Sequence, residues 1–481
     1  MAKIVGGIGN DTLVGTSAAD RLYGLAGSDS LRGGAGNDYY FINSTADRID
    51  EQGATSTADR VIATISINMN TLGAGLLENA QVLGKTNLSI VGNAKANSIV
   101  GNVGQNTLSG GSGNDTIIAI SGNDKLVGGA GDDILNGGAG NNLLLGGKGN
   151  DSYFYNGSSD KIDEQGATSL GDRVNSSVSV NLNTLAAGLI EHVFLVGSAN
   201  LVVTGNAAAN SISGNLGDNT LNGGANQDSL SGGAGNDVLN GGAGGDQLAG
   251  GLGNDTFIVD NALDQVSDDG GIDLVKTSVS VDLSSGFTGI ENVTLTGNGS
   301  IHATGNDSAN VIIGNSGSNS IQGGAGNDSL DGGAGSDFVQ GGADADTLTG
   351  GAGSDGVSGG KGNDTILLDS DTNVADIYSY HAGDLDGGAI DTFQGKMDSS
   401  LLIAPGDDII DIGDLIALDN GVAARDEIWD FITKSADGAG GLIYSIDLDG
   451  GEAASSPVQF LHFVQIQLPV WFQADNEQQA I

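Results

Sequence analysis

The chain has 481 residues, including 85 Gly, 3 Pro and no Cys, and its 60 acidic against 16 basic residues give a net charge of −44. The high glycine content and a charged fraction of 16% argue against an ordinary single-core domain, and the lack of Cys excludes disulfides and thiolate metal sites. The acidic surplus opposes binding to nucleic acid and to anionic membranes or glycans, and it makes divalent cations the natural counter-charge.

The sequence predicts neither a cleavable leader nor a membrane span. Met1–Gly7 lacks the apolar core of about 7 to 15 residues that a signal peptide needs. No segment reaches about 18 consecutive apolar residues. We therefore expect no transmembrane segment, and we expect export to use another route.

A nine-residue repeat runs through the chain in four blocks. Its first unit is Gly6-Gly-Ile-Gly-Asn-Asp11-Thr-Leu-Val, and the blocks hold four units at 6–41, seven at 92–154, six at 205–258 and seven at 305–367. All 24 units have an apolar residue at position eight, and 23 have Gly at position one, with Ala119 as the exception. A disordered linker would not keep this apolar position, so the repeat predicts folded structure.

Each unit encodes a turn followed by a short strand. The six residues Gly-Gly-x-Gly-x-Asp allow positive φ and close backbone approach, and the next three place one apolar side chain inward. Two units then make a coil of 18 residues in a parallel solenoid. The apolar core of such a solenoid is too thin to order a Gly-rich chain by itself, so another contact must hold the turns together.

The Asp at position six is the candidate for that contact. Stacked turns bring Asp n and Asp n+18 to a gap lined by backbone carbonyls. This all-oxygen, carboxylate-rich cage suits Ca²⁺, which takes 6 to 8 oxygen ligands, rather than Zn²⁺ or copper.

The consensus Gly-Gly-x-Gly-x-Asp-x-U-x, where U is apolar, is intact at 33–41, 232–240 and 323–331 and resembles the repeat-in-toxin (RTX) nonapeptide of bacterial secreted proteins. The resemblance implies an all-β fold, a right-handed parallel β-roll (β-solenoid) with Ca²⁺ between successive turns. The predicted metal ligands are the seventeen position-six aspartates Asp11, Asp20, Asp29, Asp38, Asp115, Asp124, Asp133, Asp151, Asp228, Asp237, Asp246, Asp255, Asp328, Asp337, Asp346, Asp355 and Asp364.

Pairs of Asp 18 residues apart are the strongest candidate sites and predict at least about nine Ca²⁺ ions. They are Asp11 with Asp29, Asp20 with Asp38, Asp115 with Asp133, Asp133 with Asp151, Asp228 with Asp246, Asp237 with Asp255, Asp328 with Asp346, Asp337 with Asp355 and Asp346 with Asp364. Seven units carry Asn instead: Asn97, Asn106, Asn142, Asn210, Asn219, Asn310 and Asn319. Most of these open a block, so we expect turns that fold without metal and hold fewer ions there.

Three interludes separate the blocks and are related to one another. Residues 42–91 and 155–204 share the motif Asp-(Arg/Lys)-Ile-Asp-Glu-Gln-Gly-Ala-Thr-Ser, and 259–304 follows the same pattern with four residues fewer. Their period-two alternation, as in Ile65–Met69, predicts half-buried strands. We interpret them as wider coils of the same solenoid, with an independent globular insertion as the alternative.

Composition changes after Leu367, since 368–481 hold all 3 Pro and both Trp. Within this segment, 407–416 and 444–451 resemble the C-terminal target region of RTX proteins exported by type I secretion. The predicted organisation is an RTX β-roll at 1–41, 92–154, 205–258 and 305–367, interludes at 42–91, 155–204 and 259–304, and a mostly β secretion-target and capping domain at 368–481. A purely capping domain is the alternative.

Catalytic motifs are weak. The G-x-S-x-G pattern around Ser358 and the dinucleotide-like 351–356 both follow from the repeat itself, and no His-Glu-x-x-His occurs. The histidines His192, His302, His381 and His462 are scattered. RTX repeats usually trail a catalytic domain, yet here they begin at Gly6, so we predict no enzyme and no catalytic residue.

The sequence therefore predicts a secreted calcium-binding protein that folds outside the cell and has a structural, self-assembling or adhesive role at the bacterial surface, as an S-layer or matrix protein. Expected partners are further copies of the chain, the type I secretion apparatus and cell-surface polysaccharide. The alternatives are a secreted RTX enzyme or effector with its activity in 368–481, or a carbohydrate-binding module. Net charge disfavours the latter for anionic glycans.

Overall fold

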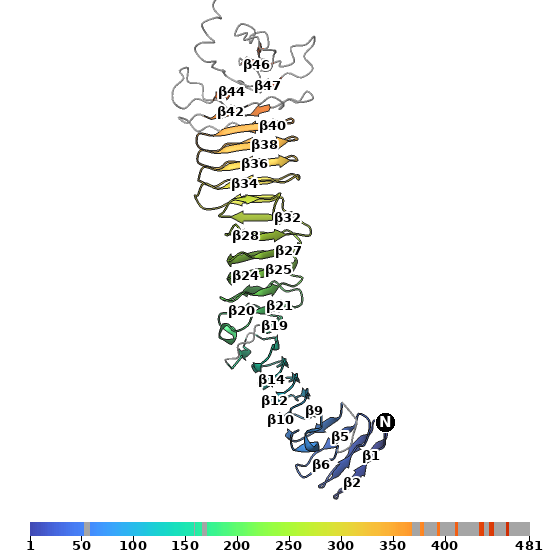
Figure 1. Cartoon of the computed structure of the whole chain (residues 1–481). Coiled ribbons are helices and arrows are strands. Elements are labelled where there is room, and N and C mark those ends of the chain that lie inside the picture. Colours follow the sequence, from blue (N-terminus) through green and yellow to red (C-terminus); the bar gives the residue numbers. More distant parts are fainter. Residues whose placement is uncertain are drawn as a thin grey trace, which may run out of the picture. The chain divides into compact units, whose positions relative to one another are not determined.

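The fold was analysed in a computed structural model, which describes residues 1–51, 58–157, 159–165, 171–367 and 376–379 and the strands at 392–394, 409–411, 432–436, 442–446 and 458–460. It separates into two compact units, Met1–Gln247 and Leu248–Ile481. Each unit is built from parallel strands that stack coil on coil (Figure 1). The described part of the chain contains no α-helix and only two short 3₁₀ helices, η1 (Leu72–Gly75) and η2 (Leu185–Gly188).

In the first unit, one long parallel sheet forms one side of the coils. Its strands, in spatial order, are β1 (Lys3–Val5), β3 (Arg21–Tyr23), β5 (Tyr39–Ile42), β7 (Arg60–Ala63), β9 (Asn79–Val82), β11 (Ser98–Val100), β13 (Thr116–Ile118), β15 (Ile134–Asn136), β17 (Ser152–Tyr155), β19 (Arg173–Ser176), β21 (His192–Leu195), β23 (Ser211–Ser213) and β25 (Ser229–Ala234).

Three groups of parallel strands form the other side of the first unit. They consist of β2 (Thr12–Val14), β4 (Ser30–Arg32) and β6 (Arg48–Ile49); of β8 (Ile67–Asn68), β10 (Ser89–Val91), β12 (Thr107–Ser112), β14 (Lys125–Ala130), β16 (Leu143–Lys148) and β18 (Lys161–Asp163); and of β20 (Val180–Asn181), β22 (Val202–Thr204), β24 (Thr220–Ala225) and β26 (Val238–Ala243).

The second unit repeats the arrangement, after β27 (Gln247–Leu252) and a short pair, β29 (Gln265–Ser267) with β32 (Phe287–Thr288). One sheet runs through β28 (Thr256–Val259), β30 (Leu274–Thr277), β33 (Asn292–Leu295), β35 (Val311–Ile313), β37 (Ser329–Asp331), β39 (Thr347–Thr349), β41 (Thr365–Leu367) and β43 (Thr392–Gln394). The other runs through β31 (Val281–Asp282), β34 (His302–Thr304), β36 (Ser320–Ala325), β38 (Phe338–Ala343), β40 (Gly356–Lys361), β42 (Ile377–Ser379) and β44 (Ile409–Asp411).

The apolar residue at position eight forms the core, as predicted. Leu126 pairs in register with Leu144, and Ile117 with Leu135, each 18 residues further on. The position-eight side chain is buried in every one of the 24 units, from Leu13 to Ile366. The prediction of an all-β parallel solenoid is therefore confirmed.

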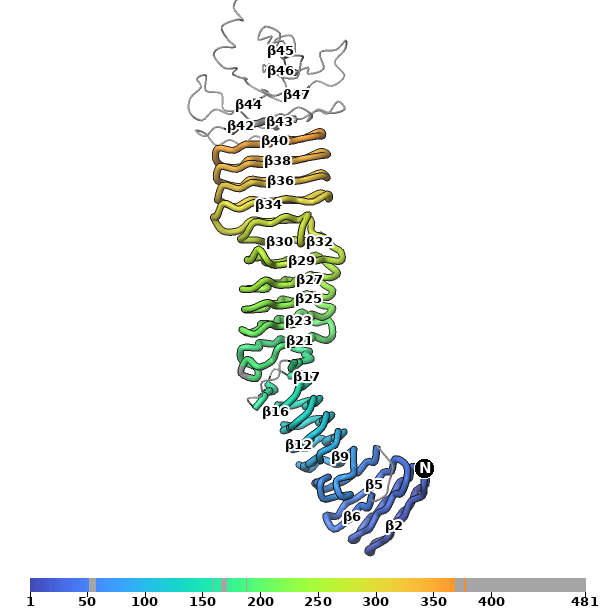
Figure 2. The backbone as a smooth tube through the Cα atoms, viewed as in Figure 1, coloured from blue at the N-terminus to red at the C-terminus, as the bar shows by residue number. Residues whose placement is uncertain are grey.

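The interludes continue the solenoid with coils of other lengths (Figure 2). In the second interlude, Tyr153 pairs with Val174, Val174 with Val193 and Val193 with Ile212, in steps of 21, 19 and 19 residues. The third interlude takes steps of 18, 18 and 19 through β28, β30, β33 and β35. The four residues it lacks are thus removed from coils, and the strand ladder is unbroken.

The ladder also continues beyond Leu367. Strand β42 pairs in parallel with β40, and the backbone N–H of Asp355 donates to Asp376 Oδ1 at 2.8 Å. Strands β47 (Val458–Phe460), β46 (Leu442–Ile446) and β45 (Ile432–Ala436) then join β43, the last two pairings being antiparallel. The remainder of 368–481, including the predicted secretion-target residues at 444–451 outside β46, lies outside the described residues.

Candidate calcium-binding turns

The position-six side chains form a ladder along the solenoid. The Oδ1 atom of each paired Asp accepts the backbone N–H of the Asp 18 residues earlier, as in Asp115 N–H to Asp133 Oδ1 at 2.7 Å and Asp133 N–H to Asp151 Oδ1 at 2.8 Å. The same bond, at 2.7 to 2.9 Å, joins the two members of eight of the nine predicted pairs. The ninth, Asp237 with Asp255, has its members in different units and stays a prediction.

The second carboxylate oxygen has no such bond in most of these turns. Oδ2 is buried and accepts no hydrogen bond in Asp29, Asp38, Asp115, Asp124, Asp133, Asp151, Asp228, Asp328, Asp337 and Asp346. Leaving a buried charged acceptor unsatisfied is costly. Ten turns therefore share one unmet requirement for a positive partner.

The unpaired oxygen faces the glycine at position one of its own unit. A Cβ on Gly128 would collide with Asp133 Oδ2 and with the carbonyl oxygen of Gly146 in the next coil, and Gly223 stands in the same relation to Asp228 and Gly241. Position one is therefore glycine because a side chain would fill this space. The carboxylate Oδ2 and the glycine carbonyl are the oxygens that would hold a hard cation such as Ca²⁺ here, and the donor set fits it.

Burial changes the protonation of these carboxylates in the absence of a cation. Burial raises the pKa of Asp133 to about 7 and that of Asp151 to about 7, although a backbone N–H bond opposes the rise in each. For Asp346, burial and the neighbouring carboxylates raise the pKa to about 8. A bound cation would thus compete with protons at neutral pH.

Two predicted ligands differ from the others. Asp11 Oδ2 accepts the N–H of Gly7 at 2.6 Å, and Asp20 Oδ2 accepts the N–H of Thr16 at 2.6 Å and its hydroxyl at 2.8 Å. Asp11 is also only half-buried. Their oxygens are satisfied within the protein, so the first two turns have less need of a cation.

The Asn turns replace the cation with hydrogen bonds. Asn206 N–H donates to Asn210 Oδ1 at 2.9 Å, and Asn210 Nδ2 donates back to Asn206 Oδ1 at 3.2 Å and to the Glu191 carbonyl at 3.3 Å. The same closed pair joins Asn93 with Asn97, Asn102 with Asn106 and Asn215 with Asn219. Sequence reasoning missed position two, although six of the seven Asn units carry Asn there as well.

Asn206→Ala is expected to weaken the solenoid without changing calcium binding. The substitution removes the bonds from Asn206 Nδ2 to the Gly188 and Ile190 carbonyls, at 3.1 and 2.9 Å, and the bond that Asn206 Oδ1 accepts from Asn210 Nδ2, while the backbone N–H of residue 206 can still donate to Asn210. We expect a loss of about 2 to 4 kcal/mol in the free energy of unfolding, measured by urea unfolding in saturating Ca²⁺. A drop in the number of bound Ca²⁺ ions would show instead that the Asn turns hold metal.

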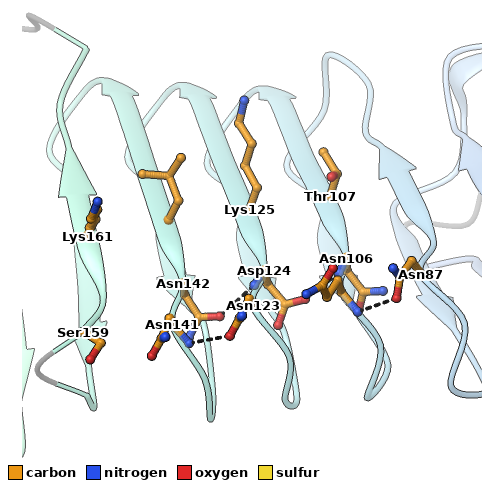
Figure 3. Close-up of a pocket in the computed structure, with 12 residues that line it drawn as sticks. Asn87, Asn106, Thr107, Asn123, Asp124, Lys125, Asn141, Asn142, Ser159 and Lys161 are labelled. Atoms are coloured by element: carbon orange, nitrogen blue, oxygen red, sulfur yellow. Dashed lines mark hydrogen bonds between the residues drawn. The ribbon is translucent and has the colours of Figure 1, made fainter.

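A second ladder runs along the outside of the turns at position five. Asn123 Oδ1 accepts the N–H of Asn141 at 3.0 Å, and Asn87 Oδ1 accepts that of Gln105 at 2.9 Å, beside the inner ladder of Asp124 and Asn142 (Figure 3). These side chains line an open polar groove of roughly 760 Å³ with Lys125 and Lys161 at its edge. No residue lining this groove is aromatic, so the groove gives the carbohydrate-binding alternative no stacking surface.

The interludes supply acidic residues that the repeat pattern did not reveal. Asp172 Oδ1 accepts the N–H of Asp151 at 2.7 Å, and Glu191 Oε2 accepts that of Asp172 at 3.2 Å. Asp59 with Glu78, and Asp273 with Glu291, occupy the same column in the other interludes. Their sequence signal is the acidic residue two positions before the inward apolar residue, as in Asp172-Arg-Val174.

The weak catalytic motifs find no supporting geometry among the described residues. Ser358 is 3% exposed and lies within strand β40, paired with Gln340, rather than on a strand-to-helix turn. His192 is half-buried in β21, where burial lowers its pKa, and His302 is exposed in β34. His381 and His462 lie outside the described residues.

In turn after turn, a buried carboxylate oxygen without a hydrogen-bond partner faces the glycine at position one. This arrangement defines a class of parallel β-solenoid whose coils are held together by hard cations. The RTX calcium-binding nonapeptide repeat matches the chain at residues 5–40, 89–117, 118–153, 202–230, 223–257, 304–339 and 332–366. The chain is thus an RTX repeat protein, and proteins with these repeats bind Ca²⁺ and are generally secreted. No curated protein matches the chain. Neither described helix has the length and apolar character of a membrane span.

Proposed function

We propose that this protein is a non-enzymatic, calcium-folded scaffold of the bacterial surface, with a self-assembling or adhesive role. The row of buried Asp Oδ2 atoms carries the proposal, because carboxylates that hold cations in turn after turn would serve architecture rather than turnover. Extracellular calcium modules bind at roughly 10⁻⁴ to 10⁻³ M. The chain would then stay unfolded in the cytosol and fold after export by the type I apparatus, with about nine ions or more.

The outer face of the first unit supports lateral assembly. Phe154 of β17 and Phe194 of β21 are each 37% exposed on the long sheet, and Ile118 and Ile134 of the neighbouring strands are 37% and 40% exposed. The strand register aligns Ile118, Phe154 and Phe194 in one outward row, in which they alternate with Asn136 and Asn175, and it places Ile134 in the neighbouring row. Exposed aromatic and aliphatic side chains at regular intervals on a sheet suit contact with another copy of the chain.

Assembly in Ca²⁺ is the test of this role. We expect the calcium-loaded chain to form growing particles by light scattering, and Phe154→Ser with Phe194→Ser to slow that growth strongly. Leu216→Ser is the matched control, because Leu216 is 71% exposed in a turn away from the row. Strictly monomeric protein at high concentration in Ca²⁺ would contradict self-assembly and favour a soluble secreted binder, or an effector acting through 368–481.

A further inference from the structure

Three buried carboxylates meet where the second roll gives way to its interlude. They are Asp151 of the last RTX unit, Glu164 just after β18 and Asp172 just before β19, and one oxygen of each lies within 4.8 Å of the others. Their side chains are 1%, 0% and 1% exposed. Only Asp151 belongs to the nonapeptide pattern, so this junction is not another RTX turn.

The oxygens at this junction are poorly satisfied by the protein. Asp151 Oδ2 accepts no hydrogen bond, and the buried Glu164 carboxylate faces the Tyr153 hydroxyl without well-formed hydrogen-bond geometry. The Tyr153 hydroxyl and Asp151 Oδ2 converge on Gly146, where RTX turns present the glycine carbonyl of the next coil instead. A fully buried Glu thus lies among oxygen atoms, with a tyrosine hydroxyl beside it.

The first junction shares the buried Glu and the tyrosine hydroxyl of this arrangement. Glu51 is 2% exposed and faces the Tyr40 hydroxyl, and that hydroxyl converges with Asp38 Oδ2 on Gly33. In each junction the interlude Glu follows the last RTX Asp by the same interval, from Asp38 to Glu51 and from Asp151 to Glu164. The same buried Glu and tyrosine hydroxyl beside the last RTX Asp at both junctions argue for a shared ligand.

The third junction also brings three carboxylates together, Asp255, Asp268 and Asp273, with one oxygen of each within 4.8 Å of the others, but it bonds its interlude acid to the backbone. Asp268 takes the place of Glu, and its Oδ1 and Oδ2 accept the N–H groups of Gly251 and Gly270 at 3.0 and 2.8 Å. Phe257 takes the place of the tyrosine. The acid at the third junction is thus one methylene shorter, the hydroxyl is absent, and the carboxylate bonds to the backbone. The Glu carboxylates of the first two junctions lack such backbone bonds.

We propose that the first two junctions are divalent-cation sites of their own, in which an interlude Glu, the last RTX Asp, an interlude Asp and a Tyr hydroxyl bind Ca²⁺. All donors are oxygens and the cluster has three carboxylates, which favours Ca²⁺ over the smaller, octahedral Mg²⁺ and over softer metals. A cation bound at each site links the last coil of a roll to the first coil of the interlude, because no further nonapeptide follows there to provide an RTX site. This inference rests on the calcium-dependent folding proposed above.

The number of bound ions tests the proposal in the full-length, calcium-loaded chain. By native mass spectrometry we expect Glu164→Gln and Glu51→Gln each to bind one Ca²⁺ fewer than the wild type, and the double variant two fewer. Asp160→Asn is the matched control, since Asp160 is 5% exposed and its Oδ1 already accepts Asn142 N–H and Nδ2. An unchanged count in Glu164→Gln, with an equal or higher melting temperature in Ca²⁺, would mean that a proton alone satisfies the junction and would overturn the proposal.

A second measurement covers a variant that fails to fold. Tb³⁺ bound in the Ca²⁺ sites should luminesce through the nearby tyrosines, so Tyr40→Phe with Tyr153→Phe is expected to remove much of the tyrosine-sensitised emission while keeping every carboxylate. Tyr23→Phe is the control, because Tyr23 stacks on Phe41, ring centroids 4.1 Å apart, on the outer face. Equal emission from the double variant and the wild type would refute the junction sites. A wild type that binds no Ca²⁺ at all would refute calcium-dependent folding as well, which separates the two failures.

Discussion

Removing Ca²⁺ at pH 7.5 is expected to unfold the four rolls. In the metal-free chain, carboxylates such as Asp133, Asp228 and Asp328 would be buried with an unpaired Oδ2, and the charge of −44 would be screened only by the monovalent ions of the solvent. The apolar core, one buried side chain per nonapeptide, is too thin to offset this cost. We expect EGTA to abolish most of the β-sheet circular dichroism, and Ca²⁺ near the millimolar range to restore it.

Mg²⁺ at the same ionic strength is the control for charge screening. It should restore little structure, because Mg²⁺ demands a small octahedral site and gives up its water reluctantly. A chain that keeps its β-sheet signal in EGTA at this pH would contradict calcium-dependent folding. Recovery with Mg²⁺ alone would show that screening, rather than a bound ion, holds the turns.

Acidification is expected to restore order to the metal-free chain. Burial raises the pKa of Asp133 to about 7, of Asp115 to about 6 and of Asp346 to about 8, from an ordinary value of 3.8. Between these values the folded state binds more protons than the unfolded state, so the free energy of unfolding falls as pH rises from about 4 to about 8. The metal-free fold should therefore be most stable near pH 4 to 5 and least stable above pH 8.

The measurement is circular dichroism in EGTA from pH 8 down to pH 4.5, followed by return to pH 8. We expect reversible gain of β-sheet signal on acidification, and a calcium affinity that rises with pH over the same interval because binding must release protons. Asp133→Asn combined with Asp346→Asn should shift the transition to higher pH, since two of the titrating charges are gone. A metal-free chain that loses structure on acidification would contradict these pKa shifts.

The sequence predicted the solenoid because its periodicity has a simple physical meaning. A residue such as Leu126 recurs at position eight of every unit, and only stacking of 18-residue coils buries all of these side chains together. The position-six column was predictable for the same reason. The spacing does not show which carboxylate oxygen accepts a hydrogen bond. It could not reveal that Asp133 Oδ1 accepts the N–H of Asp115, so that only Oδ2 remains to bind a cation.

Residues outside the strict period were harder to predict. Asn206 at position two could be assigned its role only once its amide was placed beside Asn210. Asp172 and Glu191 follow coils of 21 and 19 residues, so the 18-residue spacing does not predict that they continue the position-six column. The sequence showed that the third interlude is four residues shorter than the others. Only the strand register shows that its coils, rather than a loop, are shortened.

The most direct test of the calcium sites is anomalous diffraction from crystals of the full-length protein grown in Ca²⁺. The geometry predicts anomalous peaks beside the Oδ2 atoms of turns such as Asp133, Asp228 and Asp328, and none beside Asn97 or Asn210, whose side chains bond to their own turns. Peaks of full occupancy at the Asn turns, or ordered Asp turns with no peak, would contradict the assignment of Ca²⁺ to the spaces between Asp Oδ2 and the position-one glycines.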